Sequence, residues 1–189
     1  EPIESRMDYR LSLASADFAA LLAICLRYPT RELAEGIKTC ELQQDFAQCC
    51  DDMAIPHPCT FDQATLPNTP LEELVSLLGK DYTQLFIAPI GSITSPYECM
   101  FRNSRKRIPD EILPFVNNCT MHVEQTMRNA GVAVNRGKGE PEDHVSVELE
   151  FLRHLYLSIA RCIRSENDSE CARYRAILSD FQAKHLRGW

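Results

Sequence analysis

The residues best suited to chemistry lie close together in the stretch EPEDHVSVE, which runs from position 140 to 148. Glu140, Glu142 and Asp143 precede His144, and Glu148 follows the histidine by four residues. Residues four apart share a helix face, so His144 and Glu148 could act as a general base with its orienting carboxylate, or as two metal ligands. Three interpretations are open: a plain helix start, half of a catalytic or metal site, or a surface that receives a positively charged partner.

A metal site or a hydrolase site has little further support in the sequence. A structural zinc site typically carries CxxC pairs, and this sequence has none. It also lacks an HExxH motif, a GxSxG motif and a phosphate-cradling glycine loop. We therefore expect no metal site and no catalytic residue. The side chains considered as metal ligands are Cys49, Cys50, His57 and Cys59, and the pair Cys119 and His122.

The acidic residues exceed the needs of a helix start. Acids in a first turn interact favourably with the helix dipole, which accounts for one or two of them. Glu140, Glu142 and Asp143 lie within four positions, and Glu98 would join them if the fold brought it near. This excess favours an acidic surface for a cationic partner.

Charge and composition narrow the class of partner. The formal net charge is −7 over 189 residues, with a pI near 5.3, which argues against nucleic acid and is compatible with a cationic peptide. Taken alone, the charge is better explained by acidity that serves only solubility. No apolar run is long enough to cross a bilayer, so we expect no direct membrane insertion. Residues 1–6 precede Met7 and are set aside as a leader or cloning remnant.

The nine cysteines indicate a reducing compartment. Their number is odd, and Cys25, Cys119 and Cys162 stand at apolar positions of helical patterns, where a reduced thiol behaves as a small hydrophobe. We therefore expect free thiols and a cytoplasmic location.

The hydrophobic pattern is helical along almost the whole chain. Apolar residues recur at three- and four-residue steps, which predicts an all-α fold: one compact domain of about six or seven helices. Thr30 and Asn167 stand at expected N-caps, and Thr69-Pro70-Leu71-Glu72 has the pattern of a capping box. The expected helices span about 8–28, 30–50, 71–86, 109–130, 141–165 and a last one from 167, with loops at 51–68 and 87–98 and a flexible connection near 131–140.

The apolar stripes of these helices are expected to form the core. In the first helix the stripe consists of Leu13, Phe18, Leu21, Ile24, Cys25 and Tyr28. In the 141–165 helix, where the acids are expected in the first turn after Pro141, the stripe consists of Val147, Phe151, Leu155 and Ile159.

Four motifs occur in the order found in one known family. PEDHVSVELEFL at 141–152 resembles the signature of the TorD/DmsD/NarJ group of redox-enzyme maturation chaperones, with Glu142 inserted before the Asp143-His144 pair. The stretch DYTQLF at 81–86 is similar to the YxxLF element of that family, SPYE at 95–98 to its PYES stretch, and FQAKHLRGW at 181–189 to its late HLxxW element. The resemblance spans residues 7–189.

The resemblance implies an all-helical, non-enzymatic cytoplasmic protein without a cofactor of its own. Its partner would be the catalytic subunit of a molybdopterin oxidoreductase or the twin-arginine leader of that subunit, held until the cofactor is inserted. Arginines require carboxylates and the apolar part of a leader requires a groove. The expected peptide-binding residues are Tyr82, Tyr97, Glu98, Glu142, Asp143 and His144.

Three questions stay open at this point. The protein could instead be an assembly scaffold for a membrane-bound oxidoreductase, or a hydrolase that uses His144 and Glu148. It could be a monomer or a dimer that exchanges helices through the 135–139 connection. Family members usually continue into another helix: either this protein is naturally short or its tail has been lost, and in that case an apolar face near Phe181 and Trp189 would be incompletely covered.

Overall fold

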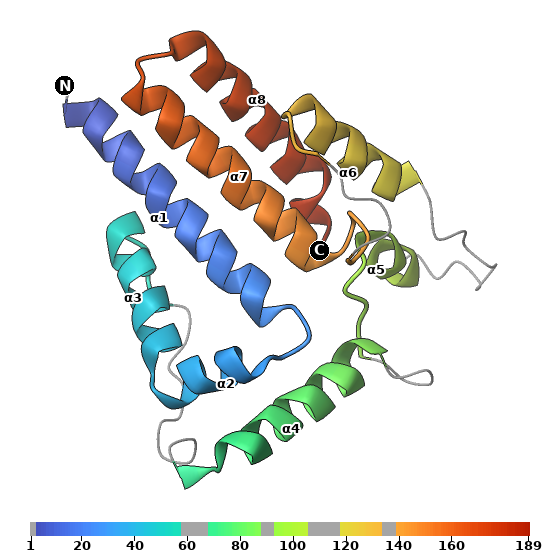
Figure 1. The fold of residues 1–189 in the computed structure, drawn as a ribbon. Helices are drawn as coiled ribbons and strands as arrows, with labels where there is room; N and C mark the ends of the chain where they lie inside the picture. Colours follow the sequence, from blue (N-terminus) through green and yellow to red (C-terminus); the bar gives the residue numbers. More distant parts are fainter. Residues whose placement is uncertain (1–2, 58–67, 88–92, 106–117, 134–138) are drawn as a thin grey trace.

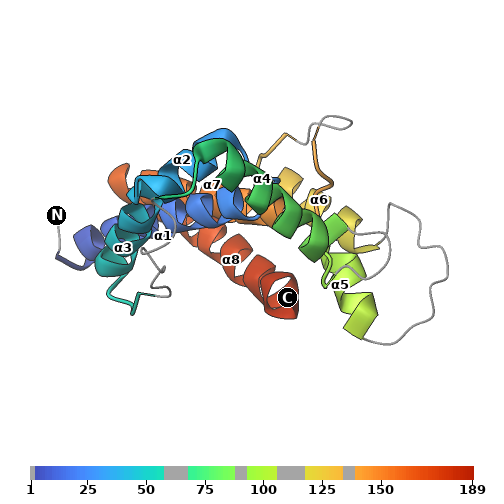
Figure 2. The same cartoon turned by 90° about the horizontal axis from the view of Figure 1, so that it is seen from below.

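Helix α7 (Val145–Arg164) is the centre of the fold, with ten buried residues along its 20-residue length. Helix α1 (Ile3–Cys25) packs along one side of it and α8 (Asp168–Lys184) along another, and all three run side by side (Figure 1). In the view from below, α8 lies on one side of the α1 and α7 pair, while α2 and α4 lie on the other (Figure 2). The side chains of α7 therefore meet partners on most of its circumference.

The computed structural model describes residues 3–57, 68–87, 93–105, 118–133 and 139–189. These residues contain eight α-helices and no strand, apart from one isolated antiparallel bridge between Tyr97 and His144. The predicted all-α fold is thus confirmed. The other elements are α2 (Arg31–Lys38), α3 (Glu41–Met53), α4 (Leu71–Tyr82) with a π-helical end (Thr83–Ile87), α5 (Glu98–Arg105), α6 (Asn118–Asn129) and a 3₁₀ turn (Leu186–Gly188).

The number of helices exceeds the prediction of six or seven for two local reasons. The helix expected over 30–50 is broken at Cys40, which adopts a left-handed backbone with φ 63°, and so it forms α2 and α3. The loop expected over 87–98 is followed directly by α5, which the sequence pattern did not indicate because it is only eight residues long. The predicted N-caps Thr30 and Asn167 are confirmed, whereas the N-cap of α4 is Pro70 and not the expected Thr69.

Helix α1 presents small residues to the core, and the stripe predicted for it is only partly correct: Leu13, Phe18, Leu21 and Cys25 are half-buried. Its buried side chains include Ala16, Ala19 and Ala23, whereas Ile24 and Tyr28 of the predicted stripe are 46% and 57% exposed. Alanines at three- and four-residue spacing let the backbone of α1 approach α7 closely, so the larger side chains of α7 fill the space between them.

The core itself joins α6, α7 and α8. Val123, Leu155 and Phe181 come from these three helices, and each is fully buried. The rings of Phe151 and Phe181 meet edge to face with centroids 4.9 Å apart. The expectation of an incompletely covered face at Phe181 is therefore wrong, because α7 and the end of α8 enclose that ring.

Several expectations fall on residues outside the described ranges. They concern the start of the helix predicted over 109–130, the central part of the 131–140 connection, and Cys59. The remaining eight cysteines are all free thiols, as the sequence predicted.

Candidate functional site

Two chain segments far apart in sequence pair at the start of α5 and α7. The backbone N–H of Glu98 donates to the carbonyl of Asp143 at 2.8 Å, and that of Val145 donates to the carbonyl of Pro96 at 2.8 Å. These two hydrogen bonds form the isolated bridge between Tyr97 and His144. The pairing brings the SPYE and PEDH motifs together and fixes the side chains of Glu98, Asp143 and His144.

His144 is the N-cap of α7. Its Nδ1 accepts a hydrogen bond from the backbone N–H of Ser146 at 3.2 Å, and its ring packs edge to face on Tyr97 with centroids 5.2 Å apart. The side chain is 1% exposed, and this burial lowers its pKa. Because α7 starts only at Val145, Glu142 and Asp143 precede the helix, and the prediction that they occupy its first turn is wrong.

Asp143 faces the start of α5. Its Oδ2 accepts a hydrogen bond from the backbone N–H of Cys99 at 3.4 Å. The carboxylate thus provides an acceptor for one of the first N–H groups of α5, which have no acceptor within the helix. The side chain is 4% exposed, and burial raises its pKa although a hydrogen bond from Thr120 opposes the shift.

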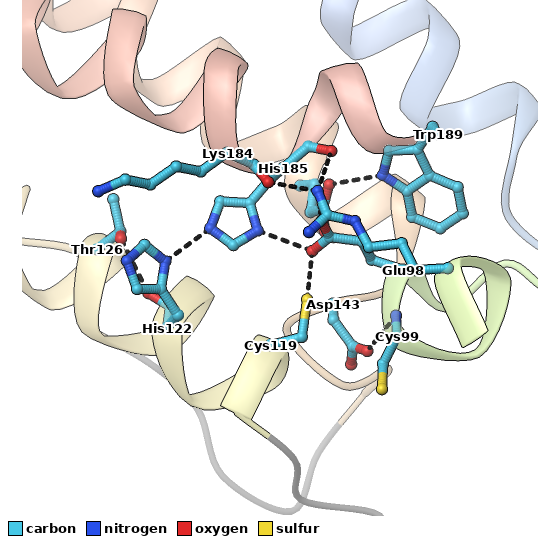
Figure 3. Close-up of polar contacts among 11 residues, drawn as sticks. Glu98, Cys99, Cys119, His122, Thr126, Asp143, Lys184, His185 and Trp189 are labelled. Atoms are coloured by element: carbon cyan, nitrogen blue, oxygen red, sulfur yellow. Dashed lines mark hydrogen bonds and ion pairs between the residues drawn. The ribbon is translucent and has the colours of Figure 1, made fainter. Parts of the chain in front are cut away.

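Glu98 is the hub of a buried polar network that joins α5, α6 and the end of α8 (Figure 3). Its Oε2 accepts from the Cys119 thiol at 2.6 Å and from Nδ1 of His185 at 2.7 Å, and its Oε1 pairs with Arg102 at 2.5 Å. Burial opposes ionisation, but the hydrogen bonds from His185 and Cys119 outweigh it and lower the pKa of Glu98. Nε2 of His185 lies 2.7 Å from Nδ1 of His122.

Glu148 adds a second, fully buried carboxyl next to Glu98. Its Oε2 accepts from Nε1–H of Trp189 at 3.0 Å, and the ring of Trp189 packs on Phe101 with centroids 5.3 Å apart. Burial, and then the charge of Glu98, raise the pKa of Glu148 to about 9. Since the ring of His144 is engaged with Ser146 and the carboxyl of Glu148 with Trp189, the two side chains proposed for a hydrolase have separate structural roles.

The stability of the protein should therefore fall as the pH rises. Glu148 keeps its proton in the folded state until about pH 9, whereas its ordinary pKa is 4.5, so the folded state binds the additional proton between these values. Raising the pH through this window favours the unfolded state.

Urea unfolding at a series of pH values measures this effect. The free energy of unfolding should decline less steeply with pH for Glu148→Gln than for the wild type. Glu150→Gln, on the same helix but half exposed, is the matched control and should keep the slope of the wild type; parallel profiles for all three proteins would contradict this assignment.

The surface beside this buried network is acidic and aromatic. Tyr97 donates its hydroxyl hydrogen to the exposed Glu140 at 2.9 Å, and burial, followed by this carboxylate, raises the pKa of Tyr97 to about 12. Glu142 is partly exposed two residues further on. Tyr82 is also close enough to Glu140 for the carboxylate to raise its pKa, after burial as the larger cause. We call Tyr97, Glu140 and Glu142 the acidic rim; Tyr82 itself is buried, at 8% exposure.

An open groove of about 600 Å³ lies next to the acidic rim, along α4 and beside Tyr28 in the loop that follows α1. Tyr82 links the two, because its ring contacts Tyr28 of the groove at 5.3 Å and Phe86 at 4.8 Å between centroids. A Cβ at Gly79 would lie 3.0 Å from the Tyr28 hydroxyl, so the exposed ring of Tyr28 would have to shift to admit a larger residue there. The lining residues are Tyr28, Val75, Ser76, Gly79, Lys80, Thr83 and Gln84.

The six residues expected to bind peptide thus fall into two groups. Glu98, Asp143 and His144 lie together but are buried, and Tyr82 is buried against Tyr28 and Phe86, whereas Tyr97 and Glu142 are partly exposed. Sequence reasoning did not connect Arg102, Cys119, His185 or Trp189 with Glu98 and Glu148. The only available signal was the motif FQAKHLRGW, which carries His185 and Trp189.

In the described part of the chain, no helix has the length and apolar character required to cross a membrane.

Comparison with known proteins supports the resemblance of the four motifs. Chaperone protein TorD from three Vibrio cholerae serotype O1 strains is 36% identical over 59 residues. The matched segment is 31% of this chain, and it covers only 26% of the length of each of these relatives. No solved structure matches the chain. The sequence profile described as nitrate reductase delta subunit matches residues 54–189, which include all four motifs and the whole buried network. The chain therefore belongs to the nitrate reductase delta subunit family, which includes the TorD-type chaperones.

Proposed function

We propose that this protein is a cytoplasmic maturation chaperone for a redox enzyme. Its client would be the catalytic subunit of a molybdopterin oxidoreductase, recognised through a twin-arginine leader and held until the cofactor is inserted and export begins. The observation that carries the proposal is the family match over residues 54–189, together with relatives named as TorD chaperones. The eight free thiols are compatible with a reducing cytoplasm.

The groove suits the apolar part of such a leader. An amphipathic helix binds by laying its apolar face into a hydrophobic groove. The groove between α1 and α4 offers the 57% exposed ring of Tyr28 together with Val75, and exposed Leu85 and Ile87 follow in the π-helical segment. Exposed apolar side chains of this kind favour a partner rather than bulk water.

The acidic rim suits the two arginines. Guanidinium groups form charge-assisted hydrogen bonds with carboxylates, and the exposed Glu140 and partly exposed Glu142 present such carboxylates next to the groove. We propose that Tyr97 and Glu142 contact the leader directly, and that Tyr82, which is buried, supports the ring of Tyr28 in the wall of the groove. Glu98, Asp143 and His144 are buried and would not contact the leader. They would hold in place the segments that carry the rim.

Titration of a twin-arginine leader peptide tests this division. The double variant Glu140→Gln/Glu142→Gln should bind about tenfold more weakly than the wild type, because solvent-exposed ion pairs are worth up to about 1 kcal/mol each and about 1.4 kcal/mol corresponds to a factor of ten in affinity. Binding to the wild type should also weaken with salt. The control Glu41→Gln/Asp168→Asn removes the same charge from exposed first-turn positions of α3 and α8 and should bind like the wild type.

Two other results would be informative about the site. If the rim variant binds like the wild type while a folded Asp143→Asn variant loses binding, the buried acids are the recognition groups and α5 must move to expose them. If neither variant is affected, the acidic residues serve only the structure. Circular dichroism of each variant separates loss of binding from loss of fold.

The description of the matching family favours one second candidate. A nitrate reductase delta subunit is named as part of an enzyme system, so the protein could assemble an oxidoreductase without reading a leader. Binding to the mature apo-subunit with its leader removed distinguishes the two. Full affinity without the leader would support the assembly role.

A further inference from the structure

Three metal-ligating side chains converge in the buried network. Oε2 of Glu98, Sγ of Cys119 and a ring nitrogen of His185 all lie within 4.8 Å of one another. They come from α5, α6 and the end of α8, and Figure 3 shows them pointing toward a common centre. We propose that Glu98, Cys119 and His185 bind one divalent transition-metal ion of the zinc type, which joins these three helices.

The chemistry of the three donors selects this class of ion. Zn²⁺ is bound by cysteine sulfur, histidine nitrogen and carboxylate oxygen, and three protein ligands with one further position form a common zinc environment. Calcium and magnesium prefer oxygen ligands only, so the thiol and the imidazole argue against them. The proposed ion is therefore Zn²⁺, or Co²⁺ as its spectroscopic substitute.

The distances require only a small rearrangement. The Sγ–Oε2 distance is 2.6 Å and the Oε2–Nδ1 distance is 2.7 Å. Zinc bond lengths of about 2.0–2.3 Å with tetrahedral angles place ligand atoms roughly 3.3–3.7 Å apart. The three side chains must therefore open by roughly 1 Å, and the cysteine loses its proton when the ion binds.

Neighbouring groups already hold the ligands in suitable orientations. Arg102 occupies Oε1 of Glu98 and leaves Oε2 directed at Cys119 and His185. Nε2 of His185 faces Nδ1 of His122 at 2.7 Å, so His122 can accept the Nε2 hydrogen and leave Nδ1 for the metal. Ligand histidines are usually oriented through their second nitrogen in this way.

Buried acidic groups supply an independent reason for a cation. Glu98 and Glu148 are 0% exposed and Asp143 is 4% exposed, and these three carboxyl groups are close enough to interact electrostatically. Within the described residues, Oε1 of Glu148 is buried and has no hydrogen-bond partner. Arg102 supplies one positive charge to this region. A divalent ion at the convergence point would offset the buried negative charge that Arg102 alone does not neutralise.

Metal titration of the full 189-residue chain tests the proposal. After removal of metal with a chelator, the wild type should bind one equivalent of Co²⁺ with a sulfur-to-cobalt charge-transfer band, and Zn²⁺ should displace it. Zn²⁺ should also raise the melting temperature. Cys119→Ser should lose the band and bind Zn²⁺ at least about tenfold more weakly.

Two further variants keep the result interpretable. Cys99→Ser is the matched control, because this buried thiol lies next to Glu98 in sequence but accepts a hydrogen bond from Asn103; it should keep the band and the affinity. His122→Ala should fold, since that residue is exposed, and should weaken Zn²⁺ binding about tenfold while the band remains. The proposal is overturned if the wild type binds no stoichiometric metal, or if the band persists in Cys119→Ser. Equal loss of the band in Cys99→Ser would also overturn it.

Discussion

Replacing Phe181 with alanine is expected to lower the free energy of unfolding by about 3–5 kcal/mol, the usual cost of truncating a buried aromatic residue. The ring is fully buried, meets Phe151 edge to face at 4.9 Å, and lies 4.9 Å from the ring of His185. Removing it leaves a cavity between α7 and α8, and it withdraws support from the histidine that hydrogen-bonds Glu98.

Urea unfolding followed by circular dichroism measures this effect. Leu77→Ala on α4 is a suitable control, since that side chain is 44% exposed and its loss should change stability by less than about 1 kcal/mol. Because the total stability of a domain is typically about 5–15 kcal/mol, the Phe181 variant should have a clearly lower midpoint. A loss below about 1 kcal/mol would mean that the end of α8 contributes little to the core.

The second large effect is expected for Glu98→Ala, again about 3–5 kcal/mol when measured without metal. This carboxylate is fully buried and serves Cys119, His185 and Arg102 at once. Its removal deprives these donors of their common acceptor in a place that water reaches poorly. The loss should be smaller for Glu98→Gln, because the amide oxygen can still accept one hydrogen bond.

A double-mutant cycle with Arg102 isolates the ion pair from the rest of the network. Arg102 is 32% exposed, so Arg102→Ala alone should cost less than Glu98→Ala. If the pair is coupled, the double variant should be more stable than the sum of the single effects predicts, by about 1 kcal/mol or more. Additive effects would show that Glu98 acts mainly through Cys119 and His185.

The helical character of the fold could be predicted because it is a local property of the sequence. The period of apolar residues on α7 and the capping side chains of Thr30 and Asn167 act within a few positions. The break at Cys40 could not be predicted, since a left-handed cysteine has no sequence signal comparable to glycine. The buried face of α1 was misassigned because alanines carry little hydrophobic signal, although they allow the closest helix packing.

The candidate site could be predicted only in part, for a similar reason. The motifs identified Glu98, Asp143 and His144, and the fold brings them together through the bridge at Tyr97. Their burial depends on how α5, α6 and α8 pack together. The spacing of residues within one segment contains no information about that packing. Cys119 was considered with His122, three positions later, as a possible ligand pair; its actual neighbours Glu98 and His185 are distant in sequence.

The packing of α1 against α7 has a consequence for folding during synthesis. The first helix ends at Cys25 and its main partner α7 begins at Val145. More than half of the chain must therefore be synthesised between them before α7 can cover the alanine face of α1. Contacts with such separation close slowly and leave apolar surface accessible in the meantime. We therefore expect the growing chain to have a late, cooperative folding step that coincides with the emergence of α7.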